Sequence, residues 1–314
     1  MATGQSYVDP VLTSLSQKYT NGSDDFIARK LFPVIVVDKP TGKYWAYNKD
    51  NLRAGGTNID LRTGRSKTSE ITFGKSLKDF GPLQEHALKD FISKDEYKFV
   101  DSPLNIESDS VENLNEVMTL AEEISLATML RDTSIVTNNI TLSGTSQFSD
   151  YANSDPFVTI KNRIIQQRNT SFKRPNTIAF GWDVWLQLVD HPKILERIKY
   201  TQTGVVGTAD FIKLFAPYGI TQVFVGAAMY DATTEGQTGT PTSVWGKDII
   251  IGFVQGTPSL RAVNGGYTLV LRDGKYVDKW DENDPKGTYV RNNDYYDQML
   301  FASELFSLIK NAVA

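Results

Sequence analysis

The chain has 314 residues, of which 40% are hydrophobic, 22% charged and 11% aromatic, and its formal net charge is −4. This composition indicates a globular protein with a sizeable core, and it argues against a disordered chain or a dedicated DNA-binding module with a concentrated basic face. The sequence has no apolar run near 18 residues and no cysteine, which excludes a membrane-spanning helix, disulfides and thiolate chemistry.

Residues 1–41 predict an N-terminal arm rather than a folded unit. The first part is polar and lacks the basic start and apolar core of a signal peptide, so we expect none. The chain turns apolar from Phe26 and predicts an extended segment at Leu31–Val37 that ends in a turn at Lys39–Gly42. Such a tail buries too little surface to fold alone, so we expect it to run over its own molecule or a neighbour.

Residues 42–82 predict an extended hairpin loop. Strand-like runs at Lys43–Tyr47 and Ser69–Gly74 flank the polar stretch 48–67, which carries a pair of adjacent glycines. A structureless loop of this length is unusual inside a compact domain and is normally functional or ordered by a partner. We therefore favour a hairpin arm that a partner orders.

The longest predicted helix spans Asp109–Arg131, and the rest of the chain is expected to be organised around it. Apolar residues recur every three or four positions from Val111 to Ile124, which places them on one helix face. Asp109 with Glu112 is typical of a capping box at the start of the helix. At about 1.5 Å per residue, this helix would be roughly 34 Å long.

The loop and the helix carry opposite charge. Residues 101–132 contain eight acids and one base, whereas residues 42–80 contain eight bases and four acids. One interpretation is two solvated faces, and the sharper one is an arm of one copy lying on the helix of another, with aromatic residues adding apolar contact. The candidate contact residues under the second interpretation are Trp45, Tyr47, Arg53, Arg62, Arg65, Lys67, Glu112, Glu116, Glu122 and Glu123.

The remaining elements indicate the α+β class, because helices and short strands alternate without a regular βαβ rhythm and without an internal repeat. A connector or short helix is expected at Gln84–Phe91. Further helices are predicted at Phe157–Gln167, Trp182–Val189, Ile194–Tyr200 and Thr208–Phe215. Further strands are predicted at Pro175–Phe180, Ile220–Val225, Ile249–Val254, Tyr267–Leu271 and Lys275–Trp280, the last two around a turn at Asp273-Gly274.

No motif for catalysis, a cofactor or a metal stands out. Of the two histidines, His191 precedes a proline at a helix break and His86 lies among polar residues, so we expect capping or packing roles. Metalloprotease, nucleophile-elbow, phosphate-loop and dinucleotide patterns are absent. Residues 281–287 superficially suggest a calcium loop, but Pro285 and Lys286 break the EF-hand pattern, so we expect a solvated acidic turn. A carboxylate pair for sugar hydrolysis remains an open alternative.

The order of arm, polar hairpin, acidic helix and mixed domain resembles the major capsid proteins of tailed bacteriophages, with the Hong Kong 97-type fold. The most specific pattern is N-T-x-x-x-G-x-D-V-W followed by H-P-x-x-L-E-R-I-K-Y, within Asn176–Tyr200. The end of the chain, Ser307–Val313, is also similar to the family's C-terminus. The resemblance implies an N-terminal arm (1–41), an extended loop (42–82), a peripheral domain (83–156 and 256–297, with a spine helix at 109–131) and an axial domain (157–255 and 298–314).

The resemblance also implies a function. A member of this family would be a non-enzymatic shell protein that forms hexamers and pentamers of an icosahedral head around double-stranded DNA. It would be assembled in the host bacterial cytoplasm and located in the virion. Its partners would be other copies, a portal, scaffolding or decoration proteins, and packaged DNA through non-specific contact, with no membrane and no cofactor. In this family the extended loop lies across the neighbouring subunit, near its spine helix.

Two alternatives stay open at this point. The first is an encapsulin-type compartment with the same fold, which enclosed protein cargo rather than DNA would distinguish. The second is a carboxylate-based α+β hydrolase, which would have a deep acidic pocket and would stay small in solution. No lysine of the hairpin loop can be matched to a crosslinking lysine.

Overall fold

The longest element of the protein is α4 (Ile106–Arg131), a helix of 26 residues. The computed structural model describes residues 7–8, 25–47, 61–62, 64, 67–68, 70, 73–99, 105–199, 206–234, 236–257 and 263–314. The helix begins earlier than predicted, because the side chain of Asn105 caps it by accepting the Ser108 N–H at 3.3 Å. The expected capping box at Asp109 is therefore wrong, since Asp109 already lies inside the helix.

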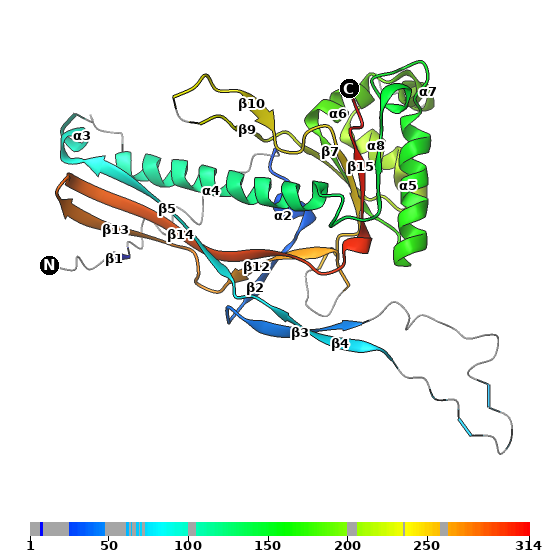
Figure 1. Cartoon of the computed structure of the whole chain (residues 1–314), viewed down its shortest axis with the longest axis horizontal. Coiled ribbons are helices and arrows are strands. Elements are labelled where there is room, and N and C mark those ends of the chain that lie inside the picture. Colours follow the sequence, from blue (N-terminus) through cyan, green and yellow to red (C-terminus); the bar gives the residue numbers. More distant parts are fainter. Residues whose placement is uncertain are drawn as a thin grey trace.

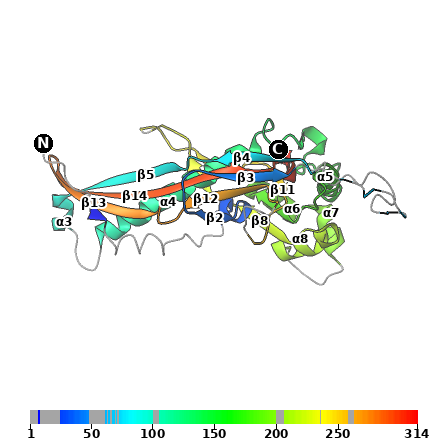
Figure 2. The ribbon, with the colours of Figure 1, turned by 90° about the horizontal axis from the view of Figure 1, so that it is seen from below.

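A long sheet lies along α4 (Figures 1 and 2). Its central strand, β14 (Lys286–Leu300), has 15 residues and pairs with strands on both edges. The other strands are β1 (Tyr7–Val8), β2 (Val34–Val37), β5 (Gln84–Ser93), β12 (Gly266–Leu271) and β13 (Tyr276–Asn283). The short helix α3 (Lys94–Phe99) follows β5 directly.

The connector or short helix predicted at Gln84–Phe91 is wrong, because this segment forms β5. Its ten residues pair antiparallel with β14, from Gln84 opposite Tyr296 to Ser93 opposite Gly287. Residues such as Gln, Glu, Ala, Leu and Lys favour helices locally, but a continuous ladder along a neighbouring strand overrides that preference.

The turn at Asp273-Gly274 exists, but it does not join two paired strands. Both β12 and β13 pair with β14, along the same line. Val270 faces Tyr296 and Tyr276 faces Asn293. The chain from β12 to β13 therefore uses six residues where β14 uses three, and the extra residues form a turn that bulges out of the sheet. The true hairpin turn joins β13 to β14 within residues 281–287, which are largely exposed as the sequence predicted.

A second sheet lies at one end of α4. Its strand order is β6 (Asn139–Thr141), β15 (Phe306–Lys310), β11 (Ile249–Gly252), β7 (Thr177–Gly181) and β8 (Gln222–Gly226). One face is covered by the helices α5 (Pro156–Ser171), α6 (Trp182–Val189), α7 (Pro192–Ile198) and α8 (Thr208–Phe215). These four predicted helices are confirmed, and their apolar faces form one core with the sheet.

The other face of the second sheet packs against the C-terminal half of α4. Leu126 and Leu130 are fully buried there, in one core with Ile250 and Leu308. Phe32 stacks on Phe306 in the same core, with 5.7 Å between the ring centroids. α4 therefore belongs to both halves of the molecule and fixes their relative position.

Residues 83–156 are predicted to lie in the peripheral domain, but the end of this range belongs to the second sheet. β6 pairs in parallel with β15, and the buried Leu142 and Phe148 pack in the core that α5 covers. The polar composition of residues 137–156 hid a strand of only three residues. Among the described residues, no helix is both long and apolar enough to cross a bilayer.

The N-terminal arm is held under α4 by two adjacent glutamates. The carboxylate of Glu123 accepts the backbone N–H groups of Ile27 and Ala28, at 2.9 and 2.8 Å, where α2 (Ala28–Leu31) begins. The same carboxylate accepts the indole N–H of Trp245 at 2.5 Å. Glu122 binds the guanidinium of Arg29 through three hydrogen bonds of 2.9–3.0 Å.

Both glutamates are buried, so the expectation that they face a neighbouring subunit is corrected. Burial raises the pKa of Glu123, and its hydrogen bonds from the Ile27 and Ala28 backbone and the Trp245 side chain oppose that rise. The carboxylates of Glu122 and Glu123 therefore bind partners within this chain and join the N-terminal arm and Trp245 to α4.

We expect Glu123→Ala to lower the free energy of unfolding by about 3 kcal/mol, because three buried donors lose their acceptor. Urea denaturation followed by tryptophan fluorescence measures the change. Glu116→Ala is the matched control, since Glu116 is exposed on the same helix and should change stability by less than about 0.5 kcal/mol. Equal stability of the two variants would contradict this role for Glu123.

Asp294 supplies a pH-dependent prediction. Burial raises its pKa, and one of its carboxylate oxygens has no hydrogen-bond partner. A raised pKa in the folded state means that folding favours the protonated acid, so its ionisation destabilises the fold as pH rises. Asp294→Asn should therefore be more stable than the parent chain at pH 7, and this advantage should shrink as pH falls toward 3.8, the usual pKa of an aspartic acid. A constant or growing advantage, measured by urea denaturation at several pH values, would refute it.

Candidate inter-subunit surface

A β-hairpin projects from the body of the molecule (Figure 1). Its strands are β3 (Gly42–Tyr47) and β4 (Lys75–Phe80), which pair antiparallel. The first strand was predicted within a residue, whereas the second strand lies beyond the predicted Ser69–Gly74. The observed register pairs Gly42 with Phe80 and Tyr47 with Lys75, which places the second strand at residues 75–80. Glycine is required at position 42, because a Cβ there would lie 2.3 Å from the Phe80 ring.

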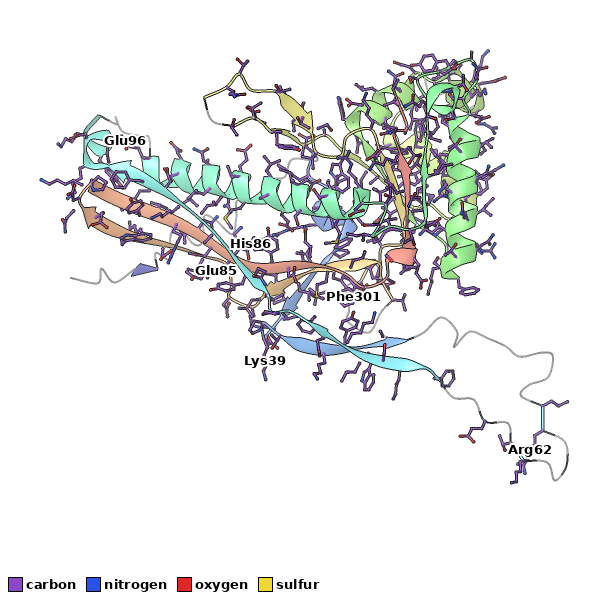
Figure 3. All side chains as sticks on the ribbon, in the orientation of Figure 1. Lys39, Arg62, Glu85, His86, Glu96 and Phe301 are labelled. Carbon is purple, nitrogen blue, oxygen red and sulfur yellow. The ribbon has the colours of Figure 1, made fainter. Side chains whose placement is uncertain are left out.

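The base of the hairpin is anchored to the long sheet. Phe80 is buried in one core with Leu83 and Tyr267. The ring of Tyr44 meets the ring of Phe301 edge to face at 4.5 Å, and Phe301 lies beside the hairpin in Figure 3. These aromatic contacts fix the direction in which the hairpin leaves the body.

The opposite face of the hairpin is apolar and exposed. Trp45 and Leu77 lie directly opposite each other across the two strands and are 51% and 49% exposed. The ammonium of Lys75 lies 4.7 Å from the centroid of the Trp45 ring. Further along, Leu61 and Phe73 are also exposed. A projecting element with large apolar side chains on its outward face is typical of an interaction surface.

The predicted arm residues that can be placed lie on this projecting segment. Trp45, Arg62 and Lys67 are exposed, and Arg62 lies far from the body of the molecule in Figure 3. The backbone of Tyr47 ends β3. The side chain of Tyr47, together with Arg53 and Arg65, lies outside the described residues.

The predicted helix residues separate into two groups. Glu116 is exposed and Glu112 half-buried on α4, so both remain candidates for contact with another copy. Glu122 and Glu123 are enclosed by this chain's own arm, as described above. The acidic surface of α4 therefore comes from its N-terminal half.

A shallow groove between α4 and β5 adds apolar surface beside these acids. It has a volume of about 290 Å³, and Ser110 on α4 closes one side by donating a 2.7 Å hydrogen bond to Asp90 on β5. Val117 is 53% exposed at this groove and Leu88 is 38% exposed. The groove residues are Leu88, Lys89, Asp90, Ser110, Asn113, Leu114 and Val117.

Sequence reasoning missed this groove. Val117 lies within the apolar stripe predicted from Val111 to Ile124, and a stripe wider than the buried face of the helix is the signal for a second surface. Leu88 was hidden by the incorrect helix prediction for β5.

The two histidines have the structural roles predicted for them. His191 is buried at the start of α7, where its Nδ1 accepts the Lys193 N–H at 3.2 Å, so its Nε2–H can donate to the Ser154 hydroxyl at 3.1 Å. Burial lowers the pKa of His191, which favours the neutral ring. His86 stacks on Tyr296 with 4.0 Å between ring centroids (Figure 3 shows His86 on β5). No group of acids and histidines among the described residues could hold a metal.

Comparison with known proteins settles the family. No family model matches the sequence. Over 311 residues, the chain is 30% identical to the major capsid protein of Burkholderia phage BcepMu, and the match covers 96% of this chain and 95% of that protein. This chain belongs to the phage major capsid proteins. It is a structural protein and not an enzyme.

Solved structures confirm the Hong Kong 97-type fold of this major capsid protein. A phage-related protein from Bordetella bronchiseptica superposes with a TM-score of 0.74 at 24% identity, over 98% of each chain. Mycobacterium phage Che8 gives a TM-score of 0.53 at 10% identity, over 100% of this chain and 95% of that chain.

Hydrogen–deuterium exchange can test how the hairpin of this capsid protein is anchored. We expect Tyr44→Ala to accelerate exchange in β3 and β4 of unassembled chains, because the edge-to-face contact with Phe301 is lost. Trp45→Ala is the matched control on the outward face of the same strand and should accelerate exchange less, because its ring contacts Lys75 of the hairpin itself and not the body of the molecule. If both variants behave alike, the contact with Phe301 does not hold the hairpin.

Proposed function

We propose that this capsid protein assembles into the hexamers and pentamers of an icosahedral phage head that encloses double-stranded DNA. The observation that carries the proposal is the projecting hairpin, whose outward face exposes the Trp45–Leu77 pair. The hairpin leaves one side of the molecule, and α4 lies toward the other side (Figure 1). A contact between two different faces is heterologous, and repeated around an axis it closes into a ring.

In this proposal the hairpin of one copy lies across α4 and the groove beside it on the next copy. Arg62 and Lys67 supply positive charge, and Glu112 and Glu116 supply negative charge. Exposed ion pairs contribute only about 0–1 kcal/mol each, so their main effect is to steer and align the encounter. Apolar side chains supply more, since fully burying a large one contributes roughly 1.5–3 kcal/mol.

The interior and the other partners follow from the same proposal. A net charge of −4 gives no overall attraction to nucleic acid, so contact with packaged DNA would be non-specific and local, through scattered lysines and arginines. A portal, and scaffolding or decoration proteins, would complete the head. Assembly would take place in the host bacterial cytoplasm.

Negative-stain microscopy of the purified protein tests the assembly. We expect closed icosahedral shells from the parent chain, and DNA rather than a protein cargo inside heads isolated from lysed hosts. A protein that stays small in solution would refute the proposal, and shells filled with a dedicated protein cargo would instead favour the encapsulin-type alternative.

The charge contribution has its own test. The triple variant Arg62→Glu, Arg65→Glu and Lys67→Glu should assemble at least tenfold more slowly at low salt, with a smaller difference at high salt. Reversing the helix charges as well, with Glu112→Lys and Glu116→Lys, should restore much of the rate. Light scattering follows the kinetics, and an unchanged rate in the triple variant would contradict the charge part alone.

A further inference from the structure

A second pair of surfaces lies at the two ends of β7, away from the hairpin. α5 ends just before this strand, and α6 begins directly after it. The five residues of β7 span roughly 16 Å, so the C-terminal end of α5 and the start of α6 lie at opposite ends of this strand, although both helices cover the same face of the sheet. Figure 1 shows the C-terminal end of α5 on the side from which the hairpin projects, and α6 on the other side.

The end of α5 holds an exposed aromatic ring in an unfavourable backbone conformation. Phe172 is 60% exposed, and its φ of 56° is left-handed. It ends the helix by donating its N–H to the carbonyl of Arg168 at 2.9 Å, a position that glycine normally occupies. A bulky side chain is disfavoured there, and the ring gains little from folding because it stays in water. Phe172 is therefore better explained by a contact made after folding.

A half-open cavity of about 250 Å³ is lined by Arg168 and Arg174, which flank Phe172 in the sequence. Its lining includes Ile165, Arg168, Arg174, Pro175, Pro217 and Tyr218. This volume can hold an aromatic ring, since cavities of about 150 Å³ bind benzene. Arg168, Lys173 and Arg174 are exposed around it, which makes this end of the molecule positive as well as apolar.

The exposed face of α6 has the complementary character. Trp182 and Leu186, one helical turn apart, are 44% and 47% exposed. Asp183 and Asp190 are exposed on the same side of the helix. Neither Lys nor Arg occurs between residues 182 and 190, so this face is negative and apolar.

We propose that the α5 end of one copy, centred on Phe172, packs against the α6 face of the adjacent copy. This inference rests on the proposed assembly, and it adds a contact between the second sheets of neighbours to the contact made by the hairpin. The partner is a second copy because the two surfaces match in charge and apolar character while lying on opposite sides of one molecule. Such a head-to-tail contact closes into a ring when its rotation matches that of the hairpin contact.

Disulfide trapping tests the contact, and the absence of native cysteine makes it clean. In the double variant Phe172→Cys, Leu186→Cys, the two thiols cannot link within one chain across the length of β7. Mild oxidation of assembled protein should therefore link different copies into a ladder that ends at five and six chains on denaturing gels. The single variants are the controls and should stay monomeric.

The outcomes separate this inference from the proposed function. Shells without a ladder in the double variant would overturn the contact and leave the capsid proposal standing. Dimers from Phe172→Cys alone would indicate a like-to-like contact and would also overturn it. If the parent chain forms no shells, the capsid proposal itself fails.

Substitutions that keep the fold supply a second readout. Phe172→Gly should keep or raise the melting temperature, because glycine suits the left-handed position, yet lower the yield of shells at least tenfold. Arg168→Glu with Arg174→Glu should lower the yield similarly, and adding Asp183→Lys with Asp190→Lys should restore it.

The control for these charge changes is Glu196→Lys with Lys199→Glu, an exposed pair in and just after α7 outside both surfaces. It should assemble as the parent chain does. Normal shell yields from Phe172→Gly and from the Arg168→Glu, Arg174→Glu variant would overturn the contact. It would also be overturned if the variant with all four charges reversed folds but does not recover its shell yield.

Discussion

The rest of the structure depends on the hydrogen bonds that the buried carboxylate of Glu123 accepts. This carboxylate accepts hydrogen bonds from the start of α2 and from Trp245, two segments that are distant from it and from each other in sequence. An ionised carboxylate only accepts, so it can satisfy several donors that converge on one point of α4. That convergence sets the N-terminal arm and the second sheet in place around one helix, and both proposed assembly surfaces depend on their relative position.

Beyond Glu123, α4 meets the long sheet through polar contacts as well as apolar ones. The side chain of Asn292 on β14 donates to Asn115 at 2.9 Å, and Gln298 donates to the backbone carbonyl of Glu122 at 3.0 Å. Hydrogen bonds are directional, so these contacts specify how far along the sheet the helix lies, which apolar packing alone defines less sharply. The exposed face of α4 is thereby presented at a fixed place relative to the hairpin.

The sequence predicts the regular helices well, because their apolar periodicity is a local signal, although the cap of α4 lies four residues before the predicted one. It fails where distant pairing decides. The segment Gln84–Phe91 favours a helix locally and becomes a strand only through its ladder with β14. Glu122 and Glu123 were expected on an exposed acidic face, and nothing nearby in the sequence shows that partners more than ninety residues away bury them. The projecting hairpin was predictable from its polar, glycine-bearing centre, whereas the groove at Val117 had only a weak signal, an apolar stripe wider than the buried face of α4.

The outer edge of β5 has a consequence for a protein that works at high local concentration. Among the described strands, β5 pairs only with β14, so a ladder ten residues long faces outward. Open edges of this kind recruit other strands and seed fibrous aggregates. Glu85, Lys89 and Asp90 place charges of both signs along this edge, and α3 terminates it. These charges disfavour backbone pairing between the β5 strands of neighbouring copies. Side-chain contacts, rather than strand pairing, then determine how the copies associate.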